Sequence, residues 1–111
     1  MILIRFIKID KDRVIVCGEN TFPIVNIDKC IIEKTIEDES IGWVYSFIKL
    51  RDNKTILIGC DNGNFCFYDM KSKEYRITKN NQNRSVLNLL IVDDNTFLSS
   101  SDDKTVKVWK Y

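Results

Sequence analysis

Four cysteines are the residues of this chain with the most obvious capacity for chemistry, because thiolates bind metals and act as nucleophiles. They stand at Cys17, Cys30, Cys60 and Cys66, and no two of them form a Cys-x-x-Cys pair. The chain of 111 residues contains no histidine, so the most common general base and a usual zinc ligand are both missing. We therefore expect four reduced, buried thiols, no metal site and no cofactor.

Neighbouring carboxylates are the second candidate, because two of them at a suitable separation can serve as general acid and general base. Asp93 and Asp94 are adjacent, but they fall in a predicted turn, where we expect water to surround them. The stretch "DNGN" at 61–64 resembles part of a calcium loop, yet Ser72 stands where the bidentate glutamate would fall. The sequence therefore predicts that the protein is not an enzyme, and an enzyme is kept only as a third hypothesis.

Composition and charge narrow the classes of partner. The chain is 44% hydrophobic and 30% charged, as is typical of one soluble globular domain. Its net charge of +1 gives no field of one sign to attract nucleic acid or an anionic membrane. The apolar start of the chain is interrupted by Arg5 and Lys8 and lacks a cleavage site, so it does not read as a secretory signal. We expect a cytoplasmic protein that binds neither nucleic acid nor membrane.

The chain repeats itself at a shift of 41 residues. An alignment without gaps superposes three segments, which are 4–18, 45–59 and 86–100. Apolar character agrees at equivalent positions, for example Ile15, Ile56 and Phe97. This periodicity divides one domain, residues 1–111, into three repeats of about 2–42, 43–83 and 84–111.

Each repeat contains short runs rich in Val, Ile, Phe, Tyr and Thr, separated by turn residues, which favours strands over helices. The expected strands are 3–9, 13–18, 22–27 and 31–36; 44–50, 55–60, 64–69 and 74–78; and 85–92, 96–101 and 105–110. Four strands in about 40 residues are typical of one blade of a β-propeller. The sequence therefore predicts an all-β fold.

The stretch "SSSDDKTVKVW" at 99–109 resembles the closing signature of a WD repeat. Asp103 stands in the turn, Thr105 follows it, and alternating apolar and basic residues lead to Trp109. The second repeat keeps the turn Asp61–Gly63 and ends on Tyr-Asp instead of Trp-Asp, whereas the first keeps only the outline and a terminal Asp28. The chain is thus similar to the WD-repeat β-propeller family over nearly its whole length.

The resemblance implies a partial WD-repeat β-propeller of three consecutive four-stranded antiparallel blades, of which the last lacks its outer strand. It assigns structural roles to Gly59, Asp69, Ser99, Ser101, Asp103, Thr105 and Trp109. The family's Gly-His pair is absent from the segments 37–43 and 79–84, so we expect greater dependence on apolar packing. We also expect Trp109, Val106 and Val108 to lie in the blade core and Lys107 to lie on the opposite, solvated face.

Trp43 is the most interesting aromatic residue outside the signature. In family propellers the loop that precedes it shares one rim with the turns between second and third strands. An aromatic side chain near acidic and amide groups is typical of protein contacts. The candidate protein-binding residues are Trp43, Tyr45, Asp61, Arg84 and Asp102. The alternative is that Trp43 only caps its own sheet.

An arc of three blades would leave the apolar faces of its first and last blades in water, at about 25 cal/mol per Å². Either the chain is a fragment of a longer propeller without independent activity, or a second chain supplies the missing surface. Two copies would give six blades, within the usual range for a closed ring. The function we expect is non-catalytic protein–protein interaction or scaffolding, with a partner of unknown identity.

Overall fold

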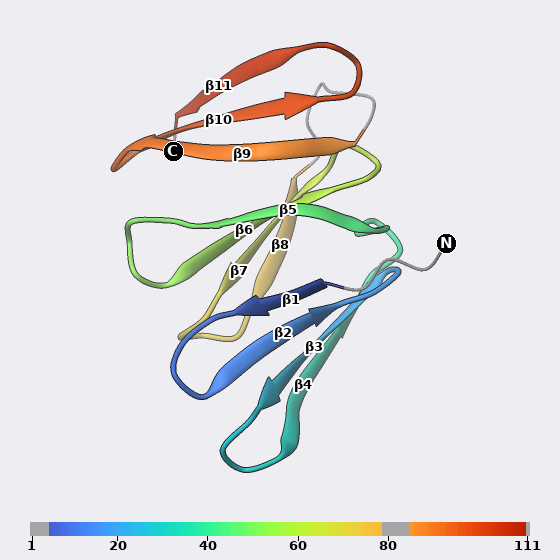
Figure 1. The fold of residues 1–111 in the computed structure, drawn as a ribbon, viewed down its shortest axis with the longest axis vertical. Helices are drawn as coiled ribbons and strands as arrows, with labels where there is room; N and C mark the ends of the chain where they lie inside the picture. Colours follow the sequence, from blue (N-terminus) through green and yellow to red (C-terminus); the bar gives the residue numbers. More distant parts are fainter. Residues whose placement is uncertain (1–4, 79–84, 111) are drawn as a thin grey trace.

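The computed structural model describes residues 5–78 and 85–110, which fold entirely into strands and turns (Figure 1). The eleven strands are β1 (Arg5–Lys8), β2 (Arg13–Cys17), β3 (Thr21–Asn26), β4 (Ile31–Glu37), β5 (Val44–Lys49), β6 (Thr55–Cys60), β7 (Phe65–Asp69), β8 (Tyr75–Thr78), β9 (Val86–Asp93), β10 (Thr96–Ser101) and β11 (Val106–Lys110). The predicted all-β fold is confirmed, and the strands follow the predicted runs closely. Among the described residues no helix is long and apolar enough to cross a membrane.

The strands form three separate antiparallel sheets, here named blade 1 (β1–β4), blade 2 (β5–β8) and blade 3 (β9–β11). In blades 1 and 2 each strand pairs with its neighbours in sequence, so every connection within a blade is a hairpin. Blade 3 has three strands in the part of the chain that the structure describes, which confirms the prediction of an unfinished last blade. Figure 1 shows the three sheets stacked in chain order without closing into a ring.

The blades pack face to face through two apolar clusters. The forward face of blade 1, defined by Ile7, Ile15, Phe22 and Ile24, packs on the backward face of blade 2, defined by Ile56, Ile58, Cys66 and Tyr68. The forward face of blade 2, defined by Leu57, Phe65 and Phe67, packs on the backward face of blade 3, defined by Leu89, Phe97 and Trp109. At both interfaces, therefore, the forward face of one blade packs on the backward face of the next blade in the sequence.

Equivalent aromatic pairs lie within both interfaces. The rings of Phe22 and Tyr68 lie 6.0 Å apart in an edge-to-face arrangement. The rings of Phe65 and Trp109 lie 5.1 Å apart in the same arrangement. Edge-to-face aromatic contacts add to the energy of apolar burial. The two interfaces thus repeat one packing solution.

The predicted alignment without gaps is wrong in the first repeat and at β9 of the third. Leu90 pairs with Leu98 as Ile48 pairs with the equivalent Leu57, so β9 is displaced by one residue from the predicted alignment. The turn after β1 is closed by a hydrogen bond from the Ile9 amide to the Arg13 carbonyl, whereas Leu50 bonds to Thr55 in blade 2, one residue farther on. The next turn is also one residue longer in blade 2 than in blade 1. There the Gly18 amide bonds to the Thr21 carbonyl in blade 1, and the Cys60 amide bonds to the Asn64 carbonyl in blade 2.

These two insertions change which residues are equivalent. Ile15 corresponds to Leu57, and not to Ile56, so its side chain lies on the forward face. In the third strand the shift is two residues, and Val25 replaces Ile27 as the counterpart of Tyr68. Single residues added in turns leave the strands intact, which is why the apolar pattern conceals them. The repeat boundaries themselves stay a prediction.

The same shift moves the residue that closes the third strand from Asp28 to Asn26. Asn26 Oδ1 accepts a hydrogen bond from the Lys29 amide at 2.9 Å. Asp69 Oδ1 accepts the equivalent bond from the Ser72 amide at 3.0 Å. The amide oxygen in blade 1 and the carboxylate oxygen in blade 2 therefore accept the same turn hydrogen bond.

The expected orientation of β11 is also wrong. Val106 and Val108 are 69% and 63% exposed, whereas Trp109 packs on blade 2 and shares the backward face with Lys107. The two valines lie on the forward face, which no further sheet covers among the described residues. An alternating strand has two faces, and its pattern alone does not say which of them meets a neighbour.

The cysteines are all free, but they are not all buried as expected. Cys30 is exposed, because it occupies the left-handed position, with φ 54°, of the turn between β3 and β4. Burial raises the pKa of the Cys17 and Cys66 thiols to about 12, and it raises the pKa of Cys60 further. These three thiols stay protonated at neutral pH and are poor nucleophiles.

Gly59 lies at a close contact between blades 2 and 3, where an added Cβ atom would also overlap the Ser46 hydroxyl. A Cβ atom at this position would lie 2.7 Å and 2.9 Å from the Cγ1 and Cβ atoms of Val86. We expect Gly59→Ala to lower the free energy of unfolding by about 1–3 kcal/mol, as overpacking does. Urea denaturation measures this loss. Gly18→Ala is the matched control, since its Cβ would meet Thr21 Cγ2 at an ordinary 3.6 Å, and equal losses in the two variants would contradict the account.

Asp69 makes stability depend on pH. Hydrogen bonds from the Ser72 and Lys71 amides hold the pKa of its carboxyl below the ordinary 3.8. A depressed pKa stabilises the fold above the unfolded pKa, and this stabilisation is lost as the pH falls through the folded pKa. Between about pH 5 and about pH 3, we expect the free energy of unfolding to fall less in the Asp69→Asn variant than in the wild type. The variant keeps the turn hydrogen bond, because Asn26 shows that an amide oxygen accepts the same bond. Parallel pH profiles would refute this role of Asp69.

Candidate protein-binding rim

The turns between second and third strands lie at one edge of all three blades, together with the connection from β4 to β5 (Figure 1). We call this edge the rim. Its parts are 18–20 in blade 1, the connection 38–43, the turn 61–64 in blade 2 and the turn 102–105 in blade 3. The sequence places its candidate protein-binding residues in and beside these segments.

Asp61 fixes the backbone on which Trp43 is mounted. Its Oδ1 atom accepts a hydrogen bond from the Trp43 amide at 3.1 Å, and its own amide donates to the Trp43 carbonyl at 2.8 Å. Gly42 precedes Trp43 with φ +60°, and a Cβ atom there would overlap the Asp61 carboxylate. The indole itself is partly exposed. Trp43 is thus a partly exposed aromatic side chain on a tightly held backbone.

Asparagine side chains hold the rest of the connection. Asn20 Oδ1 accepts from the Gly42 amide at 2.8 Å, and the Asn20 amide donates to the Gly42 carbonyl at 2.8 Å. From the other side, Asn62 and Asn64 donate to the Ser40 carbonyl at 2.8 Å and 3.0 Å. The segment without a Gly-His pair is therefore tied to turns of blades 1 and 2 by amide groups. Sequence reasoning missed these asparagines, whose only signal was their position in turns.

The other predicted rim residues are placed less closely together. Tyr45 is partly exposed on β5, at a break in the pairing between β5 and β6. Asp102 is exposed in the turn of blade 3, and Arg84 lies outside the described residues. Ser85 donates its hydroxyl to the Asp61 carbonyl at 3.0 Å, which ties the start of β9 to the same turn. The structure joins Trp43 and Asp61 directly. It places Tyr45 on β5 and Asp102 in the turn between β10 and β11.

Comparisons with known proteins match the fold but not the sequence. No family model and no curated protein sequence matches the chain. The crystal structure of the WD40 β-propeller domain of Doa1 superposes with a TM-score of 0.78 and 15% identity, covering 97% of this chain and 36% of that one. The fold is that of part of a WD40 β-propeller. The computationally designed protein Ika4 also superposes, with a TM-score of 0.68 and 17% identity, covering 96% of this chain and 63% of that one. The chain thus spans less than two thirds of either structure.

Blade 3 contains the side-chain hydrogen bonds that its WD-like signature suggests. Trp109 Nε1 donates to Ser99 Oγ at 2.8 Å, across the pair of strands β10 and β11. The Asp103 carboxylate accepts from both the amide and the hydroxyl of Thr105, and the Asp103 amide donates to Ser101 Oγ at 3.2 Å. The bonds to Ser99 and Ser101 tie β11 and the turn before it to β10, and the Asp103–Thr105 bonds close the turn itself.

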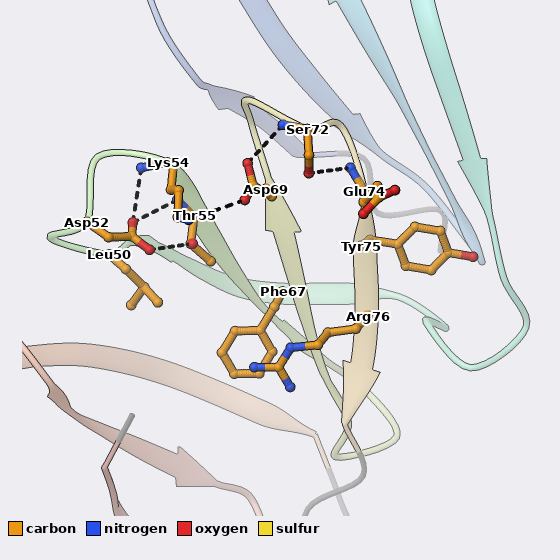
Figure 2. A pocket seen from close by; sticks show the side chains of 10 residues that line it. All are labelled: Leu50, Asp52, Lys54, Thr55, Phe67, Asp69, Ser72, Glu74, Tyr75 and Arg76. Carbon is orange, nitrogen blue, oxygen red and sulfur yellow. Dashed lines mark hydrogen bonds and ion pairs between the residues drawn. The ribbon is translucent and has the colours of Figure 1, made fainter.

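A groove of about 480 Å³ lies at the opposite edge of blade 2 from the rim (Figure 2). The Arg76 guanidinium stacks over the Phe67 ring at 4.2 Å, and both side chains lie on one wall. Asp52 and Asp69 line the groove, but turn amides occupy their carboxylates. Desolvation raises the pKa of Asp52, yet hydrogen bonds from Thr55 and Lys54 outweigh it and leave the pKa lowered. Neither carboxyl is suited to act as a general acid at neutral pH.

Metal ligands do not converge in the parts of the chain that the structure describes. No group of three His, Cys, Asp or Glu side chains in residues 5–78 and 85–110 has the arrangement that a metal ion needs. The rim carries the partly exposed Trp43 and the exposed carboxylate of Asp102, and side chains of these kinds contact proteins.

The bond between Ser99 and Trp109 can be measured by a double-mutant cycle. We expect Ser99→Ala and Trp109→Phe to show a coupling energy of about 1 kcal/mol in urea denaturation, because each variant alone breaks a bond whose acceptor is buried. Ser100→Ala is the matched control, since Ser100 lies on the other face of β10. The assignment would be contradicted if Trp109→Phe coupled to Ser99→Ala no more strongly than it couples to Ser100→Ala.

Proposed function

We propose that the chain is a non-catalytic protein-binding or scaffolding module that contacts its partner through the rim. The observation that carries this proposal is the partly exposed Trp43 indole on a backbone fixed by Asp61. A WD40-type scaffold is compatible with protein interaction but does not by itself determine a function. The rim supplies the specific argument.

The physical case rests on entropy and solvation. An aromatic side chain on a rigid backbone loses little freedom on binding, so more of its apolar contact contributes to affinity. Tyr45 on β5 and Asp102 in the turn of blade 3 add a second aromatic ring and an exposed carboxylate. Arg84 remains part of the proposal by its position in sequence. The partner that suits these groups is a protein surface with an apolar pocket and a polar border.

The proposed setting is the cytoplasm. The four free cysteines fit a reducing compartment, where thiols persist without pairing. The net charge of +1 supports a protein partner rather than nucleic acid or an anionic membrane. The occupied carboxylates of the groove support a binding role rather than an enzymatic one.

A second candidate function is structural, and a different observation favours it. Large apolar side chains are exposed on the two outer faces of the arc, among them Phe6 at 70% and Leu90 at 61%. Surfaces of this kind are typical of interfaces rather than of solvated faces. In this candidate function the three blades are one part of a larger closed propeller and have no activity of their own.

Site-specific photocrosslinking in cell lysate tests the rim. We expect a photoreactive amino acid at position 45 to capture a discrete partner, and Trp43→Ala in the same chain to reduce the capture about tenfold or more, as loss of a binding hot spot does. The matched control carries the same group at Lys11, which is exposed in the turn at the opposite edge. Equal capture at position 11, or capture unaffected by Trp43→Ala with an unchanged circular dichroism spectrum, would refute the rim proposal.

A further inference from the structure

Both outer faces of the arc are apolar grooves. The backward face of blade 1 forms a groove of about 260 Å³ lined by Phe6, Val14, Val16, Val25 and Ile27. The forward face of blade 3 forms a groove of about 220 Å³ whose apolar lining includes Leu90, Leu98 and Val106. Val108 extends this second face and is 63% exposed. Apolar area on this scale is costly to leave in water.

The forward face of blade 3 is the same surface that blades 1 and 2 bury. By strand pairing, Val106 takes the place of Phe65 in blade 2 and of Phe22 in blade 1. Leu98 likewise takes the place of Leu57. Phe22, Phe65 and Leu57 all pack against the backward face of the next blade. The free face of blade 3 is therefore built to meet a backward face.

The backward face of blade 1 is the complementary surface. Val25 takes the place of Tyr68 in blade 2 and of Trp109 in blade 3, and Val14 takes the place of Ile56. Tyr68 and Trp109 each contact the forward phenylalanine of the preceding blade. The contact that both internal interfaces share would thus pair Val106 with Val25 at a third interface. Both residues are valines, so their contact is apolar but smaller than the aromatic contacts at the two internal interfaces.

A polar group also recurs at the equivalent position. Ser46 donates its hydroxyl to the Val86 carbonyl at 2.9 Å and so links β5 of blade 2 to β9 of blade 3. Asn88 takes the place of Ser46, because Ser46 pairs with Gly59 and Asn88 pairs with the equivalent Ser100. Asn88 also lies in the open groove of blade 3. It offers an amide donor where the internal interface uses a hydroxyl donor.

We propose that a second copy of this chain covers both outer faces, with the forward face of blade 3 in each copy packed on the backward face of blade 1 in the other. A two-fold axis makes the two contacts identical and leaves no face of either type uncovered. The six sheets that result fall within the range of closed propellers. A single contact between like faces would instead leave the second face of each copy in water. This inference rests on the second candidate function and not on rim binding. Its test changes no candidate residue of the rim, so its failure would not count against the rim proposal.

The test is the molar mass of the purified chain by light scattering or sedimentation over a range of concentrations. We expect twice the chain mass of 13.0 kDa for the wild type. Val106→Asp and Val25→Lys should each give monomers, because each puts an unpaired charge into both contacts. Asn95→Asp is the control for added charge, since Asn95 is exposed in the turn between β9 and β10, and it should stay dimeric.

Mixing the two variants makes the test specific for the proposed contact. In a mixed dimer one interface sets the carboxylate introduced at position 106 against the ammonium group introduced at position 25. The other interface carries only wild-type residues, so we expect dimers to return. Circular dichroism of each variant before mixing shows whether it is folded, and return of the dimer on mixing supports the proposal even if one variant alone is unstable. A monomeric wild type, open oligomers that grow with concentration, a Val25→Lys variant that stays dimeric, or no recovery on mixing would each overturn it.

Discussion

The structure depends on one constraint, which is that each sheet has two apolar faces and both must be covered. A half-solvated sheet alternates apolar and polar residues, whereas β6 carries buried apolar side chains on both sides, Ile56 and Ile58 backward and Leu57 forward. A sheet of this kind is stable only between two others. Stacking of blades follows directly, as does the need for Gly59 at a close contact between blades 2 and 3. The exposed outer faces follow from the same constraint, because each lacks a neighbour among the described residues.

Polar groups in the turns have the complementary task of fixing one strand to the next. Carboxylate or amide oxygens accept from amides two or three residues on, as Asp52, Asp69 and Asn26 do. At the rim the same chemistry works between blades, where Asn20 and Asn62 hold the connection 38–43. Amide groups thus hold this connection in a chain that contains no histidine. These contacts are the basis of the proposal that Trp43 binds a partner.

Much of the fold was predictable from sequence, because strand runs and turn residues are local signals. The WD-like stretch at 99–109 predicted the unfinished third blade, and the structure agrees. The frames of the first repeat and of β9 were not predictable, since single-residue differences in turns leave every apolar run intact. The exposure of Val106 and Cys30 also escaped prediction, because it depends on which face has a neighbour and on turn geometry. The amide contacts of Asn20 required coordinates, since nothing in the sequence says where a turn side chain points.

Contacts between methyl groups and aromatic rings, measured by nuclear Overhauser effects, test the central claim most directly. If forward faces pack on backward faces in the frame described, the δ1 methyl group of Ile15 lies against the side chains of β6 and β7 that share its cluster. The methyl groups of Val14 and Val16 then show no contact with those strands, because they point to the outer groove. Contacts from Val14 and Val16 to β6 and β7, with none from Ile15, would restore the alignment without gaps and contradict the account.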